Sequence, residues 1–249
     1  MTKRCKEENI LSRRFSAGGV LGDKKRRIFL IQKKETGEWL LPKGGIKPGE
    51  SKQEAALREV REETGFVDIK LLFPEVIETV KWRKGNYEKT VYYFPLIAKT
   101  LRKTANSQIA NENFSGRWFD FEEALKTLTF AEAKEVVAKY KYYLCLYEVK
   151  EMLIKHPEVV SVCVCGSMAC GAIIPGWSDI DVVVVVNRLD SLLYQFFREV
   201  LAATEGYGIR TSIFPIEKEE ISQGRAFQLD GKIRDAIFLN QFKVIAGRR

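Results

Sequence analysis

The amino-acid sequence predicts a two-domain protein of mixed α and β class (α/β or α+β), and three observations support this expectation. First, strand-like apolar runs alternate along the chain with segments whose apolar residues have helical spacing. Second, 249 residues are many for one ordinary domain and enough for two small ones. Third, a long helical pattern from about Phe130 to Lys155 separates two groups of strand-like segments. We therefore expect one domain at 1–145, with a short basic extension up to about residue 11, and a second domain at 146–249.

The first half of the chain has strand and turn signals around one capped helix. Two apolar runs between residues 15 and 34 are separated by the turn-like sequence GDKKRR. A helix is expected to begin at Ser51, because Ser51 and Glu54 have capping-box spacing, and to stop at Gly65. The other expected elements are the strand DIKLLF, the hairpin strands VIETVKWRK and KTVYYFPLIAKT, and a helical segment at 121–128.

The second half has fewer elements. In order, we expect a strand at 158–165, the helix-capable segment GSMACGAIIPG, a strand at 180–186, a helix at 191–204, a strand at 208–216, a weak helix and the terminal strand QFKVIAGRR. Pro175 and Gly176 interrupt GSMACGAIIPG before the second strand begins.

Composition and charge narrow the classes of function. The longest apolar runs have the length of strands, well below the roughly 18 residues that span a bilayer, so no membrane role is expected. The amino-terminal sequence MTKRCKEENILSRR lacks the apolar core of a signal peptide, which makes a cytoplasmic location the default expectation. The formal net charge of +8 suits an anionic partner such as a nucleotide, a phosphorylated metabolite or RNA. A solvated basic surface explains the charge equally well.

Few residues other than carboxylates are available for catalysis. The five cysteines are an odd number without a second ligand pair for zinc, so we expect reduced thiols. The single histidine, His156, ends a helical pattern, where a solvated side chain is expected. Any chemistry should therefore depend on acidic residues.

The helix that begins at Ser51 carries a cluster of such residues. At about 100° per residue, Glu59, Glu62 and Glu63 fall on one helix face within roughly 100° of arc. Like charges this close repel one another unless a cation is present. Hard divalent ions bind oxygen clusters of this kind, whereas a solvated acidic face is the plainer alternative.

The spacing of the surrounding residues favours the metal site. Gly44, five residues, Glu50, seven residues and then Arg58-Glu59-Val60-Arg61-Glu62-Glu63-Thr64-Gly65 matches the Nudix box. Phe66 is the one departure, since the family usually has an aliphatic residue there. Over roughly residues 12–145 the chain thus resembles a Nudix hydrolase.

This resemblance implies an α/β/α sandwich with a mixed sheet and metal-dependent cleavage of a nucleoside diphosphate linked to another moiety. Transferred to this sequence, Glu59, Glu62 and Glu63 would coordinate Mg²⁺ or Mn²⁺ together with the backbone carbonyl of Gly44. Arg58 would orient the glutamates, and Lys43 would contact phosphate. Glu50 would either support the metal ligands without binding the ion or be a ligand at the start of the helix. The general base would be one of the glutamates or a residue outside the box.

The sequence says less about substrate specificity than about the metal site. The segments WLLPKG before the box and TLTFAEAKEVVAKY after it look like the dinucleoside-polyphosphate and diphosphoinositol branch of the family. The basic hairpin offers cations to a polyphosphate at Lys81, Arg83, Lys84 and Lys89, although a solvated rim is the favoured interpretation. The aromatic residues Trp39, Tyr92 and Phe94 could stack on a base, but aromatic residues on sheets usually belong to the core.

A second acidic site is predicted near the strand at 180–186. Asp179 and Asp181 are two residues apart on an extended segment, so their side chains share one face. Upstream, Gly166 and Ser167 follow a strand and offer N–H groups and a hydroxyl to phosphate, and Ser178 precedes the first aspartate. An exposed pair of aspartates without a role is the alternative.

The pattern Gly166-Ser167, eleven residues and Asp179-Ile180-Asp181-Val182 resembles the polymerase-beta-type nucleotidyltransferase signature, in its minimal branch. The resemblance covers about residues 146–249 and implies metal binding by Asp179 and Asp181 and nucleotide binding by Gly166, Ser167 and Ser178. The family normally adds a third carboxylate from a later strand, but the candidate strand at 208–215 contains none. The acidic residues considered for this role come after it, at Glu217, Asp230 and Asp235.

Together these features predict a Mg²⁺-dependent Nudix hydrolase that acts on a dinucleoside polyphosphate or a similar molecule. The second domain would bind a nucleotide and is a candidate for nucleotidyl transfer. Two alternatives stay open. In one, nucleotidyl transfer is the principal chemistry and the Nudix domain proofreads its product. In the other, the protein senses nucleotide or RNA and its second domain is catalytically inert.

Overall fold

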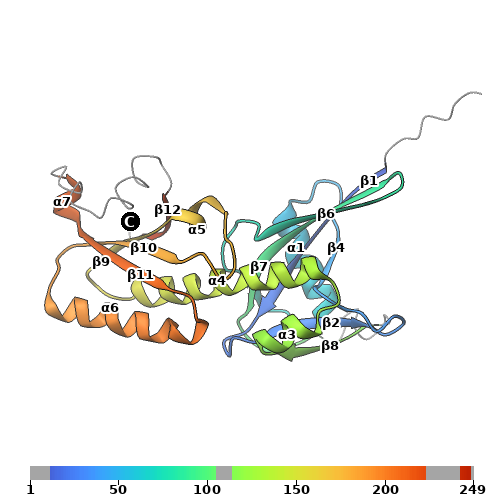
Figure 1. Cartoon of the computed structure of the whole chain (residues 1–249), viewed down its shortest axis with the longest axis horizontal. Helices are drawn as coiled ribbons and strands as arrows, with labels where there is room; N and C mark the ends of the chain where they lie inside the picture. Colours follow the sequence, from blue (N-terminus) through green and yellow to red (C-terminus); the bar gives the residue numbers. More distant parts are fainter. Residues whose placement is uncertain (1–11, 105–113, 223–241, 248–249) are drawn as a thin grey trace, which may run out of the picture. The chain divides into compact units, whose positions relative to one another are not determined.

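The computed structural model describes residues 12–104, 114–222 and 242–247 (Figure 1). The chain divides into two compact units, Met1–Tyr140 and Lys141–Arg249. The division falls within helix α4 (Ala131–Leu153), and the boundary near residue 145 stays a prediction. Both units contain a mixed sheet, which confirms the predicted class of mixed α and β structure.

The first unit is built on an eight-stranded sheet whose central path is β3-β2-β1-β7-β5. Three further strands attach to it, since β4 pairs with β1, β6 with β7 and β8 with β2. The strands are β1 (Ser12–Gly22), β2 (Ile28–Lys33), β3 (Trp39–Leu40), β4 (Lys43–Gly45), β5 (Ile69–Leu71), β6 (Glu78–Lys84), β7 (Tyr87–Ala98) and β8 (Phe114–Phe119). β1 and β7 are parallel along eleven residue pairs and form the centre of the sheet.

Helices cover both faces of this sheet. Helix α1 (Lys52–Thr64) packs its small residues Ala55 and Ala56 against Ala17 of β1 and Phe94 of β7. Side chains alternate along β7, so Tyr93 faces the opposite side of the sheet. That side is covered by α3 (Phe121–Thr127) and the first part of α4, which come after β8 in the chain. The first unit is therefore the α/β/α sandwich that the sequence predicts.

Local signals set the ends of α1 as expected. The Ser51 hydroxyl accepts a hydrogen bond from the Glu54 N–H, and the Glu54 carboxylate accepts one from the Ser51 N–H, which completes the capping box. Gly65 ends the helix in the left-handed conformation, with φ of 77°.

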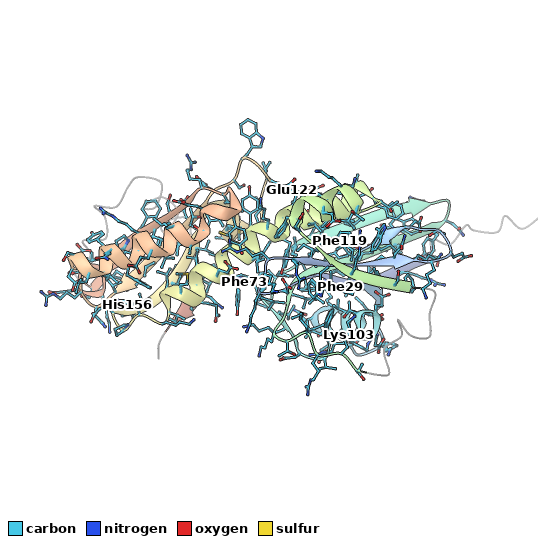
Figure 2. The ribbon with its side chains drawn as sticks, turned by 90° about the horizontal axis from the view of Figure 1, so that it is seen from below. Phe29, Phe73, Lys103, Phe119, Glu122 and His156 are labelled. Carbon is cyan, nitrogen blue, oxygen red and sulfur yellow. The ribbon has the colours of Figure 1, made fainter. Side chains whose placement is uncertain are left out.

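Phe66, the departure from the usual pattern, is part of the core of the first unit. Its side chain is 2% exposed, and its ring meets Phe29 edge-on with centroids 5.1 Å apart. Trp118 lies 5.3 Å from the same ring, and the Lys103 ammonium lies over it at 4.6 Å. Phe29 and Lys103 are labelled in Figure 2. The aromatic residue thus fills space between α1 and the β2–β8 edge of the sheet.

The second unit contains a four-stranded sheet in the order β11-β10-β9-β12. β10 and β11 are parallel, whereas β9 is antiparallel to both β10 and β12. Its elements are β9 (Val159–Cys165), α5 (Gly166–Cys170), β10 (Ile180–Val186), α6 (Ser191–Thr204), the 3-10 turn η1 (Glu205–Tyr207), β11 (Thr211–Glu217), α7 (Lys218–Ser222) and β12 (Phe242–Gly247). The expected strand at 208–216 begins later, because Gly208 ends η1 with a positive φ of 61°.

Helix α6 and the last part of α4 lie along one face of this second sheet (Figure 1). Val162, Val164, Val182 and Val184 point to that face and are buried. On the other face, Cys163, Cys165, Val183 and Ile216 form a smaller apolar cluster. Across the described residues, no helix is long and apolar enough to cross a membrane.

Candidate functional site

The guanidinium of Arg58 is the centre of the acidic cluster on α1. It donates two hydrogen bonds to the Glu50 carboxylate, at 2.7 and 2.8 Å, and one to Glu59 at 2.6 Å. Longer contacts reach Glu62 at 3.3 Å and the carbonyl oxygen of Gly45 at 2.9 Å. These hydrogen bonds lower the pKa of Glu50 to about 2 and raise the pKa of Arg58 above its usual value. Arg58 thus ties the loop before α1 to two of the three helix glutamates.

Glu59 is fixed against the backbone of β4. A Cβ atom placed on Gly44 would lie 2.1 Å from Glu59 Oε2, so any larger residue at position 44 would displace this carboxylate. Gly44 itself pairs with Ala17 in the sheet. The close approach explains why this position requires glycine.

The third glutamate faces the next residue of β4. The Glu63 carboxylate accepts a 2.7 Å hydrogen bond from the backbone N–H of Lys43. Glu59, Glu62 and Glu63 are therefore brought to one end of the sheet, beside Gly44 and Lys43, but each is held by a different donor. In the described part of the chain, no three acidic, histidine or cysteine side chains converge closely enough to hold a metal ion.

The chemistry of this donor set nevertheless suits a hard divalent ion. Three carboxylates and a backbone carbonyl supply only oxygen, which Mg²⁺ and Mn²⁺ prefer. The absence of a Cβ on Gly44 also leaves its backbone directly beside Glu59.

A pocket of about 590 Å³ opens beside the acidic cluster. Its lining includes Leu40, Lys43, Trp82, Lys89, Tyr93 and Phe130. Burial lowers the pKa of Lys89, and the positive charges of Lys43 and Arg14 lower it further. Burial also raises the pKa of Tyr93, with a contribution from the Glu63 charge. The pocket therefore combines an apolar and aromatic wall with the cations of Lys33, Lys43 and Lys89, and the carboxylates of Glu38 and Glu132 also line it.

Sequence reasoning found only part of this pocket. Lys89, one of the four hairpin cations for which a solvated rim was the favoured interpretation, lines the pocket, but Lys81 and Arg83 are on the other face because side chains alternate along β6. The Lys84 side chain lies outside the described part. Among the aromatic candidates, Phe94 is buried in the core, and Tyr92 lies under the ammonium of Lys52.

Trp39 packs edge-on against Phe119. The pocket instead uses Trp82, Tyr93, Phe114 and Phe130. Counting every second residue from Lys89 would have found Tyr93, but no local signal indicates the contribution of Phe130.

The second predicted site is assembled at one end of the β9–β10 pair. The antiparallel register sets Val182 opposite Val164, so Asp181 lies opposite Cys165 and next to the Gly166–Ser167 turn. Gly166 has a positive φ of 61°, which allows the sharp exit from β9. Burial raises the pKa of the Cys165 thiol to about 11, and the Asp181 charge adds to this shift.

Asp179 and Ser178 have different environments from Asp181. Asp179 accepts a 2.5 Å hydrogen bond from Arg210, a residue that the sequence did not single out. The Ser178 hydroxyl accepts a hydrogen bond from the N–H of Ile174 and so braces the preceding loop. Its predicted contact with phosphate stays a prediction.

The position for a third carboxylate is occupied by a hydroxyl. β11 is parallel to β10 and sets Ser212 opposite Asp181. Glu217 lies opposite Val186, five residues further along, which is about 16 Å at roughly 3.3 Å per residue. Because Glu217 is an odd number of residues from Ser212, its side chain also points to the other face of the sheet. The Glu217 carboxylate accepts a hydrogen bond from the Leu189 N–H. Asp230 and Asp235 lie outside the described residues.

Comparison with known protein families agrees with both sets of motifs. The NUDIX domain model matches residues 12–140, and the nucleotidyltransferase domain model matches residues 146–236.

Among curated proteins, the chain is similar to the asymmetrical bis(5'-nucleosyl)-tetraphosphatase of Mus musculus. The two are 34% identical over 124 residues, which cover 47% of this chain and 80% of the relative. The Caenorhabditis elegans protein of that name is 31% identical over 107 residues, 43% of this chain and 75% of the relative. An RNA pyrophosphohydrolase of Erythrobacter litoralis is 47% identical over 55 residues, 21% of this chain and 34% of the relative.

Among solved structures, a binary complex of the C. elegans Ap4A hydrolase matches with a TM-score of 0.46 and 25% identity. The match covers 53% of this chain and 97% of that one. The family match extends over more than half of the sequence and includes the Gly44–Gly65 motif described above. The chain therefore belongs to the Nudix hydrolase family, as an enzyme that cleaves acid anhydrides, and carries a nucleotidyltransferase domain after its Nudix domain.

Proposed function

We propose that the first unit hydrolyses a dinucleoside polyphosphate, or a similar nucleoside diphosphate linked to another moiety, in the presence of Mg²⁺ or Mn²⁺. The observation that carries this proposal is the double role of Lys43. Its backbone N–H holds Glu63 of the acidic cluster, while its side chain lines the aromatic and cationic pocket. A phosphate chain bound by the pocket therefore ends beside the carboxylates.

The residues divide into two groups by their chemistry. Trp82 and Phe130 offer apolar surface to a base, and Lys43 and Lys89 attract the phosphate oxygens. Glu59, Glu62, Glu63 and the Gly44 carbonyl would hold the divalent ion, with Arg58 keeping the glutamates in place. When bound there, such an ion lowers the pKa of water and neutralises charge on a diphosphate.

The reaction is a hydrolysis in which water forms a new P–O bond and one bridging P–O bond breaks. One product keeps the oxygen of water, and the other leaves with the bridging oxygen. The names of the two tetraphosphatase relatives support a substrate with several phosphates between two nucleosides.

The test is hydrolysis of diadenosine tetraphosphate in ¹⁸O-labelled water, followed by mass spectrometry. We expect AMP and ATP as products, with the label in one of them. A Glu62→Gln/Glu63→Gln variant should lose at least roughly 100-fold in rate, the scale of one preorganised electrostatic contact. An Asp179→Asn/Asp181→Asn variant serves as the matched control and should keep the rate. Full activity in the glutamine variant would refute the assignment.

For the second unit we propose that Asp179 and Asp181 would hold a divalent ion, and that a nucleotide binds there beside the Gly166–Ser167 turn. The Ser212 hydroxyl opposite Asp181 favours binding over efficient transfer, because the β11 residue at that position supplies no carboxylate. Incubation with radiolabelled nucleoside triphosphates and total RNA distinguishes the two. Label on an acceptor that disappears in the Asp179→Asn/Asp181→Asn variant would show transfer, and RNA as acceptor would identify the partner.

A further inference from the structure

The loop between α5 and β10 presents an unusually exposed aromatic side chain. Trp177 is 87% exposed, and Ile174 in the same loop is 61% exposed. Large aromatic side chains are rarely left in water, because each buries an area that strongly stabilises a core or an interface. Because most of its side chain is exposed, Trp177 contributes little stabilisation to the fold of the second unit.

The loop that carries Trp177 is firmly held. The Ile174 carbonyl accepts hydrogen bonds from the N–H groups of Trp177 and Ser178, at 3.1 and 2.9 Å. The Ser178 hydroxyl accepts one from the Ile174 N–H, which closes the turn from the other side. The Gly176 N–H donates to the Tyr142 hydroxyl of α4 at 2.9 Å. Because these bonds fix the backbone on both sides of Trp177, the indole is displayed from a preorganised turn.

This turn lies directly beside the second acidic site. Trp177 precedes Asp179 by two residues, so their Cα atoms are at most about 7 Å apart. Arg210 contacts Asp179 through its side chain and the Ile180 N–H through its carbonyl oxygen. An exposed indole, a largely exposed guanidinium and two carboxylates thus occupy one short stretch of surface.

We propose that Trp177, with Ile174 beside it, is a stacking platform for the base of a nucleoside triphosphate whose phosphates would be bound through a divalent ion at Asp179 and Asp181. This inference rests on the nucleotide-binding role proposed above for the second unit. The adjoining charges favour a nucleotide over an apolar protein partner, because a protein interface on Trp177 would also have to cover Asp179 and Arg210. A flat indole accepts every base, so the site should discriminate weakly between bases.

The experiment measures binding of ATP and of inorganic tripolyphosphate to the full chain by calorimetry with Mg²⁺. A Glu62→Gln/Glu63→Gln background prevents hydrolysis by the first unit. The binding component of interest is the one that Asp179→Asn/Asp181→Asn removes. For that component, Trp177→Ala should weaken ATP binding by roughly 5- to 150-fold, the range measured for loss of one base–aromatic stack. Tripolyphosphate has no base and should bind equally well to both proteins.

Two further variants control for a general surface effect. Trp177→Phe should restore most of the ATP affinity, because a phenyl ring still stacks. Leu192→Ala removes another exposed apolar side chain of this unit and should change nothing. Equal ATP affinity in Trp177→Ala and its parent would overturn the platform and leave the aspartate site in place. ATP binding that does not depend on Asp179 and Asp181 would overturn both proposals.

Discussion

Replacing Gly44 by alanine tests whether the position of the Glu59 carboxylate controls catalysis. The new methyl group would lie 2.1 Å from Glu59 Oε2 and 2.5 Å from Oε1, whereas ordinary contact begins at 3.4 Å. The carboxylate must therefore retreat by about 1.3 Å, and its 2.6 Å hydrogen bond from Arg58 must break or reorient. Because the Glu59 side chain is flexible at its end, the movement should cost the fold little.

The expected effect on catalysis is large. A misplacement of about 1 Å in a catalytic group typically costs about 100-fold in rate. We expect kcat/KM for diadenosine tetraphosphate to fall by that factor in Gly44→Ala, while the thermal unfolding midpoint changes by only a few degrees.

The neighbouring residue is the matched control. A Cβ on Gly45 would meet nothing within 4 Å, so Gly45→Ala should keep nearly full activity. Equal kcat/KM in the two alanine variants would show that the position of Glu59 does not matter. Should Gly44→Ala fail to fold, Glu59→Gln tests the same carboxylate without steric conflict.

Three other predictions concern stability and thiol reactivity. Phe66→Ala should lower the free energy of unfolding by about 3–5 kcal/mol in urea denaturation, because it leaves a cavity in the aromatic core, and a loss below 1 kcal/mol would contradict the packing described. The pKa of Glu50 falls from 4.5 to about 2 on folding, so its contribution to stability is complete above pH 4.5 and disappears as the pH falls to 2. Arg58→Ala removes the largest cause of this shift, and the stability difference from wild type should shrink over that pH range in denaturation curves. The exposed thiol of Cys170 should react with a maleimide at pH 7 in native protein, whereas the buried Cys165, with its pKa of about 11, should stay unmodified in peptide mass spectra.

Elements defined by neighbouring residues could be predicted from the sequence. The capping box at Ser51, the stop at Gly65 and the paired aspartates at the start of β10 depend on residues within one turn or one strand. The same locality explains why the box of glutamates was recognisable before the fold was known.

Features that depend on long-range pairing could not be predicted. The parallel pairing of β1 with β7 joins residues 75 positions apart in the sequence, and only this register decides that Tyr93 faces the pocket and Tyr92 faces α1. The ion pair of Arg210 with Asp179 likewise depends on the turn before β11. A single sequence contains no local signal for either contact.

The small side chains on the buried face of α1 have a consequence for how this enzyme can change. Ala55 and Ala56 set the distance between the helix and the sheet, and Ala55 lies one helical turn before Glu59, on the same side of the helix. A larger residue at either position would lift the whole helix and shift all three carboxylates in the same direction. Two methyl groups therefore help to set where all three carboxylates lie.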